Sequence, residues 1–239
     1  MIARGTRGPG SADPIVIIAV VLLAYYFLTG SLQGPIQNAG RDPLAFVAFV
    51  IAIGLGITVH EFMHAYMANR QGDDTARLMG RLTLNPLAHF DIFGTVLLVV
   101  AGFGYGKPVP FNESRLRGAF GVTLVALAGP LANLALAAVC AVPLRFAALL
   151  PVEYVRVLEV VVFYNCVLFV FNLLPIPPLD GANVVYGLLS PTQRWAWRSY
   201  QQYGPMLLLL LLLVGGRFFF TLVFGPAQFV ASLLLGASF

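Results

Sequence analysis

Residues 44–68, LAFVAFVIAIGLGITVHEFMHAYMA, decide how this chain folds. The run is almost wholly apolar, and it exceeds the ~20 residues that a helix needs to cross a bilayer. Its only acidic, basic or imidazole side chains are His60, Glu61 and His64. The run therefore predicts a membrane-spanning helix that carries these three ionisable side chains close together.

The composition of the whole chain is that of an integral membrane protein. Of its 239 residues, 59% are hydrophobic and 10% are charged, and the mean hydropathy is +0.86. Soluble domains carry about 25% charged residues. The net charge of +4 fits the Lys and Arg excess of cytoplasmic loops, so we expect a lipid bilayer and no nucleic acid as partner.

The apolar runs predict an all-α polytopic membrane protein with about five or six transmembrane helices. We expect a single domain over residues 1–239, with a catalytic core at about 44–187 and flanking helices at about 14–30 and 204–236. The first run is expected to be a spanning anchor rather than a signal peptide, because no small-residue cleavage pattern follows it. Further spans are predicted at about 119–142, 157–174 and 205–224.

A shorter apolar piece, residues 92–103, follows the first of these core helices. We interpret it as re-entrant or obliquely packed, because a turn-back keeps the basic residues of 70–81 and 107–117 on one side of the membrane. The same layout predicts a cytoplasmic N-terminus. The alternation of residues 81–84 predicts a short strand with a free edge for an extended substrate, with a simple extended linker as the alternative.

The spacing of His60 and His64 places both imidazoles on one helical face, where they can share a metal ion. Zinc accepts neutral imidazole and carboxylate in tetrahedral geometry and leaves one position open for water in catalytic sites. Glu61 lies beside the pair and could act as general base, taking a proton from water and passing it to the leaving amine. A chance match is disfavoured, because ionisable side chains in hydrocarbon are expensive unless they are paired.

A tetrahedral zinc site needs a third protein ligand, and Asp180 is the best candidate. It follows Pro175, Pro177 and Pro178, which remove backbone donors and end the preceding helix. Irregular backbone at membrane depth must line a cavity. From the residues alone, an ordinary Asp-Gly turn after a helix end explains the segment equally well.

A membrane HExxH followed far downstream by Leu179-Asp180-Gly181 resembles the site-2 protease family. Four further stretches are similar to a compact prokaryotic branch of that family, namely Gly80 to His89, Gly94-Thr95, Lys107 to Pro110 and Ala128 to Asn133. The similarity implies one zinc ion per chain, held by His60, His64 and Asp180, with Glu61 as catalytic base. The sequence departs from the branch at Ile92, where proline is common, and at Ala182, where glycine is common.

Three more polar side chains are candidates for supporting roles. His89 could orient a zinc ligand or gate the site, or it could simply lie at the water interface. Asn133 could bond backbone or substrate, or it could join two helices. Asn172 could stabilise the oxyanion of the reaction, or it could serve packing alone.

Together these observations predict a zinc endopeptidase that cuts peptide bonds within or next to transmembrane segments of membrane proteins, as in regulated intramembrane proteolysis. We expect it in the prokaryotic cell (inner) membrane, with no appended peptide-binding or nucleotide-sensing domain. A membrane zinc carrier or sensor using the same ligands is the alternative. A metalloprotease with a downstream Glu ligand is disfavoured, because Glu153 and Glu159 are predicted on the far side.

Overall fold

The computed structural model describes residues 39–92, 94–95, 98, 106–214 and 216–236. This part of the chain is all-helical, as predicted, and four of its helices are long and apolar enough to cross a membrane. These are α3 (Pro43–Arg70), α6 (Gly121–Leu144), α7 (Val152–Asn172) and, over residues 218–235, α10 (Gly216–Leu235). The predicted span within residues 14–30 lies outside the described residues.

Other elements connect or flank these helices. They are α4 (Thr75–Leu78), η1 (Pro86–Ala88), η2 (Glu113–Arg115), η3 (Ala147–Leu149), α8 (Asp180–Leu188) and α9 (Pro191–Val214). The helix predicted at 205–224 overlaps two elements of the structure, α9, which ends at Val214, and α10, which begins at Gly216.

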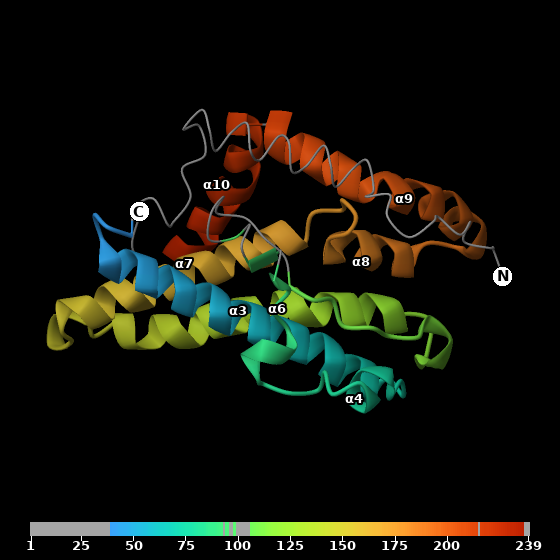
Figure 1. The fold of residues 1–239 in the computed structure, drawn as a ribbon, viewed down its shortest axis with the longest axis horizontal. Coiled ribbons are helices and arrows are strands. Elements are labelled where there is room, and N and C mark those ends of the chain that lie inside the picture. Colours follow the sequence, from blue (N-terminus) through green and yellow to red (C-terminus); the bar gives the residue numbers. More distant parts are fainter. Residues whose placement is uncertain (1–38, 93, 96–97, 99–105, 215, 237–239) are drawn as a thin grey trace. The chain divides into compact units, whose positions relative to one another are not determined.

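Helix α3 packs against both α6 and α7, which run alongside it (Figure 1). The His64 ring, late in α3, bonds the Val125 carbonyl, early in α6. The Gly56 carbonyl, earlier in α3, accepts a bond from Asn133, later in α6. The two helices are therefore antiparallel. Helices α6, α7 and α10 meet in a core of small and β-branched residues, which lets membrane helices approach closely; its buried members are Ala137, Ala141, Val162, Cys166, Ala227 and Ala231.

The beginning of α3 is fixed by Asp42, which accepts a hydrogen bond from the Ala45 amide at 3.0 Å while Pro43 occupies the first helical position. The Asp42 carboxylate also pairs with Arg156 near the beginning of α7. Because these two helix beginnings meet, α3 and α7 run parallel to each other. The site residues of α3 lie toward its other end.

The loop before α6 returns to the C-terminal end of α3. The Arg117 amide donates to the Gln71 carbonyl at 2.9 Å, and Asp73 accepts a bond from the Asn112 amide. Residues 71–73 and 112–117 therefore lie together, which agrees with a turn-back between them. Most of the turn-back itself, at 93, 96–97 and 99–105, lies outside the described residues and stays a prediction.

The predicted strand at residues 81–84 is wrong, because Leu82 and Thr83 form bends and no strand occurs in the described part of the chain. The Arg81 guanidinium bonds the Ala88 carbonyl, and the His89 ring donates to the Thr83 carbonyl. These two bonds hold residues 81–83 against residues 88 and 89. An isolated antiparallel bridge joins Phe90 to Gly106 instead.

Candidate functional site

Three of the predicted site residues meet at one point in the structure. The Nε2 atoms of His60 and His64 are 3.0 Å apart, and the Asp180 Oδ2 atom lies 3.0 Å from the first and 3.1 Å from the second. Ligands on a tetrahedral zinc ion are about 3.3 Å apart. The side chains are 9%, 9% and 17% exposed, so the group is almost enclosed.

The wall of this group is the backbone of α6 at Gly129. A Cβ atom there would lie 2.3 Å from the His64 Nε2 atom and 2.7 Å from the His60 Nε2 atom. Any other residue would fill the space between the donor atoms. Glycine at this position therefore leaves room for an ion, which fits the zinc that the donor set favours.

The other nitrogen of each imidazole has an oxygen acceptor. The His60 Nδ1 atom lies 2.6 Å from Asn133 Oδ1, and the His64 Nδ1 atom lies 2.7 Å from the Val125 carbonyl oxygen. With the protons on Nδ1, each Nε2 lone pair faces the Asp180 carboxylate. Zinc-binding histidines are oriented in this way by the partners of their second nitrogen.

Asp180 reaches this group because α8 begins directly against the end of α7. A Cβ atom at Gly181 would lie 2.2 Å from the Leu173 carbonyl oxygen, so only glycine allows this close contact. Helix α7 ends at Asn172, before the prolines that the sequence analysis identified. The chain then turns so that Asp180 is the first residue of α8.

Glu61 is half-buried and lies next to the donor group on α3. A Cβ atom at Gly106 would be 3.4 Å from its Oε1 atom, so the backbone of the 106 segment passes beside the carboxylate. Within the described residues, Glu61 makes no hydrogen bond or ion pair. Its carboxylate oxygens therefore have no described hydrogen-bond partner that would compete with a water molecule.

His89 and Asn172 lie apart from the three donors. His89 is fully buried, and its Nε2 atom donates to the Thr83 carbonyl at 2.8 Å, so the ring holds the turn before it. Asn172 donates to the Leu168 carbonyl of its own helix at 3.0 Å. No described contact links either residue to the donors, and the roles expected for them stay predictions.

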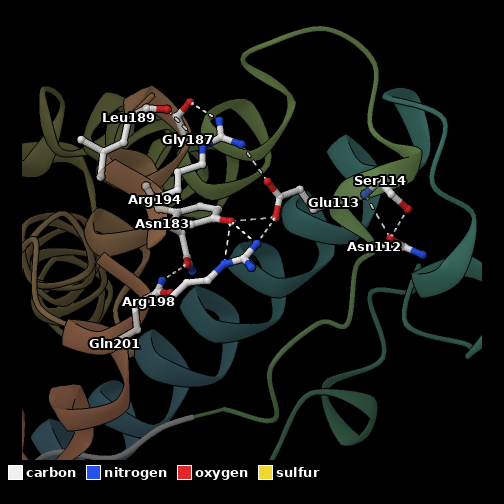
Figure 2. A network of polar contacts seen from close by, with 10 residues as sticks. Asn112, Glu113, Ser114, Asn183, Gly187, Leu189, Arg194, Arg198 and Gln201 are labelled. Carbon is white, nitrogen blue, oxygen red and sulfur yellow. Dashed lines mark hydrogen bonds and ion pairs between the residues drawn. The ribbon is translucent and has the colours of Figure 1, made fainter. Parts of the chain in front are cut away.

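A polar network that sequence reasoning missed ties the helix of Asp180 to its surroundings (Figure 2). Glu113 of η2 accepts from Arg194 of α9 at 2.8 Å and from the Tyr186 hydroxyl of α8 at 3.0 Å. The Tyr186 hydroxyl in turn accepts from Arg198 at 2.8 Å, and Arg194 donates to the Gly187 carbonyl at 3.0 Å. No sequence spacing signals these contacts, because they join segments far apart in the chain.

Comparison with known proteins identifies the family of this chain. Peptidase family M50 matches residues 48–149 and 145–215. The candidate zinc metalloprotease YwhC of Bacillus subtilis is 40% identical over 68% of this chain and 78% of its own length. The candidate zinc metalloprotease Rip2 of Mycolicibacterium smegmatis is 33% identical over 98% of this chain and 94% of its own length.

The similarity extends to archaea, since the candidate zinc metalloprotease MJ0611 of Methanocaldococcus jannaschii is 33% identical over 59% of this chain and 71% of its own length. No solved structure matches the chain. The extent of the family match, the identities and the four apolar helices lead to one assignment. The chain is an integral membrane zinc metalloprotease that belongs to Peptidase family M50, the site-2 protease family.

Proposed function

We propose that this chain is an intramembrane endopeptidase that hydrolyses peptide bonds within or next to transmembrane segments of other membrane proteins. One zinc ion per chain is held by His60, His64 and Asp180, and Glu61 is the general base. The observation that carries the proposal is the meeting of three enclosed donor atoms, two from the otherwise apolar helix α3 and one from the beginning of α8.

The depth of the donors supports a substrate inside the bilayer. His64 lies about 9 Å of helix rise before Arg70, where α3 ends. With the charged Arg70 taken as the membrane boundary, a peptide bond beside His64 would lie below the membrane surface. A helical substrate must unwind locally first, because its carbonyl groups are engaged in its own hydrogen bonds.

The residues of the chain have distinct tasks in this reaction. When bound, zinc would polarise the scissile carbonyl and make water acidic enough to attack near neutral pH. Glu61 takes the proton from the attacking water and delivers it to the leaving amine. Asn133 and the Val125 carbonyl keep the two imidazoles oriented through their Nδ1 atoms. Asn172 remains a candidate for stabilising the oxyanion.

We also propose the organisation and location expected from the sequence. The chain forms a single catalytic unit over residues 1–239, with its core at about 44–187, in the prokaryotic cell membrane and with a cytoplasmic N-terminus. The bacterial and archaeal sources of the relatives support this location.

The test is cleavage of a panel of single-span membrane proteins by the purified full-length chain in liposomes with zinc. We expect Glu61→Gln to lower the rate about 100- to 10,000-fold while zinc stays bound, as loss of a general base does. Asp180→Ala and a chelator should each abolish cleavage. The matched control is Glu153→Gln, an exposed acid in the first turn of α7, which should cut as wild type does.

A different outcome would favour the alternative function. If wild type and Glu61→Gln bind zinc equally and neither cuts any substrate, the chain does not act as an endopeptidase on this panel. Transport of zinc across the liposome membrane by both proteins would then establish a carrier.

A further inference from the structure

We propose that Asn165, acting through Asn133, fixes the ring proton of His60 on Nδ1 and so keeps its Nε2 atom available to the metal. Both asparagines are positioning residues. The inference rests on the proposed function, since it takes His60 as a zinc ligand. It adds a residue, Asn165, to which neither the motifs nor the comparisons assign a role.

The two asparagines form a chain of side-chain amides that crosses three helices. Both are 0% exposed, Asn133 on α6 and Asn165 on α7. The Asn133 amide nitrogen donates to the Gly56 carbonyl of α3 at 3.0 Å and to Asn165 Oδ1 at 3.0 Å. The Asn165 amide nitrogen donates to the Val161 carbonyl at 2.8 Å.

Two backbone carbonyls set the direction of every bond in this chain, because a carbonyl oxygen can only accept. The Val161 carbonyl requires the NH₂ group of Asn165, which turns Asn165 Oδ1 toward Asn133. The Gly56 carbonyl and that Oδ1 atom then require the NH₂ group of Asn133. Its remaining atom, Oδ1, is an acceptor and faces His60 Nδ1 at 2.6 Å. A proton on Nδ1 follows, and Nε2 keeps its lone pair.

The packing around Gly56 shows that this contact is tight. A Cβ atom there would lie 2.6 Å from Leu168 Cδ1 and 2.9 Å from Asn165 Oδ1. At Gly54 on the same helix, a Cβ atom would meet nothing within 4 Å. Helix α3 therefore approaches the asparagines closely at the Gly56 carbonyl, which sets the orientation of the Asn133 side-chain amide.

Packing alone does not explain two fully buried amides here. The neighbouring core of α6 and α7 is built from small apolar residues such as Ala137 and Val162. An unpaired buried amide would be costly, yet each NH₂ group and each Oδ1 atom of this pair has a partner. A fully bonded polar pair that ends on His60 is suited to orienting that ring.

The first test reads the ring protons directly by ¹⁵N NMR of imidazole nitrogens in the full-length, zinc-free protein. The chain has 3 histidines, so the spectrum is simple. We expect Nδ1–H at His60, lost or mixed with Nε2–H in Asn133→Ala. His64 is the internal control, since its Nδ1 atom bonds the Val125 carbonyl and should not change. A neutral His60 ring in wild type that carries Nε2–H without Nδ1–H would overturn the proposal without any variant.

The second test measures zinc affinity by competition with a chromophoric chelator. Loss of the residue that orients a zinc ligand typically lowers metal affinity about 10- to 100-fold, and we expect this for Asn133→Ala. Asn165→Ala should have a smaller effect, because the Gly56 carbonyl still directs Asn133. The double variant should bind zinc as Asn133→Ala does, since Asn165 acts only through Asn133.

Additive losses in the double variant would overturn the proposal, because Asn165 would then act by another route. The control is Asn69→Ala on α3, whose side chain bonds Asp74 outside this chain of amides. If His60→Ala lowers zinc affinity but neither Asn133→Ala nor Asn165→Ala does, only this inference fails. If His60→Ala leaves zinc affinity unchanged, the proposed function itself fails.

Discussion

The backbone of Gly129 lies directly against the imidazole of His64, at a distance that excludes any side chain. A Cβ atom at this position would be 2.3 Å from His64 Nε2. We expect Gly129→Ala to place a methyl group among the donor atoms and to lower zinc affinity about 10- to 100-fold. Overpacking of this kind costs about 1–3 kcal/mol.

The measurement is a zinc titration of the purified protein with a competing chelator. Gly54→Ala is the matched control in a spanning helix, because a Cβ atom there has no neighbour within 4 Å. A Gly129→Ala protein with wild-type zinc affinity would show that the donor group is not the metal site.

The junction of α7 and α8 should respond in a similar way to Gly181→Ala. The added methyl group would meet the Leu173 carbonyl oxygen at 2.2 Å and push the beginning of α8 away from α7. We expect a loss of about 1–3 kcal/mol in stability and weaker zinc binding, since Asp180 moves with α8. Thermal unfolding with and without zinc measures both effects. Gly225→Ala in α10, where a Cβ atom meets nothing within 4 Å, should lower neither stability nor zinc affinity.

The network around Glu113 should hold the loop before α6 against α8. Tyr186→Phe removes the hydroxyl that donates to Glu113 but keeps the ring, over which the Arg194 guanidinium lies 5.0 Å from the centroid. The Glu113 side chain is 38% exposed, so we expect only about 0.5–1 kcal/mol of local destabilisation. Faster hydrogen exchange in residues 112–117 would report it. Removing the exposed Arg77 to Asp74 pair with Arg77→Gln should leave that exchange unchanged.

Asp73 should make the same loop sensitive to acid. Burial opposes the ionisation of Asp73. Hydrogen bonds from Thr75 and from the backbone N–H of Asn112, together with the positive charge of Arg115, nevertheless hold its pKa below the ordinary value. A lowered folded pKa stabilises the fold fully above the unfolded pKa of about 3.9, and this contribution disappears as the pH falls through the folded pKa.

We therefore expect Asp73→Asn to destabilise the loop by about 1.5–3 kcal/mol near pH 7, because it removes charge-assisted bonds. The difference from wild type should shrink below about pH 4. Hydrogen exchange at the backbone N–H of Asn112 measures this difference in stability across the pH range. Asp74→Asn, at a half-exposed neighbour, is the control, and an equal effect there would contradict a specific role for Asp73.

The local part of the site was predictable because it depends on one helical turn. His60 and His64 share a face in any α-helix, and an apolar run of that length is a spanning helix. Asp180 was harder, since nothing in the spacing brings it to His64. Its assignment needed the prolines before it and the resemblance of the whole pattern to a known family.

What the sequence analysis missed depends on contacts between helices. Asn165 is an amide inside an apolar run, which is a usable signal, but its partner is set by how α6 meets α7. The strand predicted at 81–84 failed because alternation does not reveal that Arg81 and the Thr83 carbonyl bond inward. A sequence pattern predicts the structure of one segment, whereas these hydrogen bonds depend on how two segments meet.

The order of the donors along the chain has a consequence for biogenesis. His60 and His64 enter the membrane with α3, whereas Asp180 is made only after α6 and α7 have been synthesised. Chains are made from the N-terminus, so a nascent protein holds two imidazoles without the carboxylate that completes the site. On the proposed zinc site, we therefore expect metal loading and proteolytic activity only after α8 has been made.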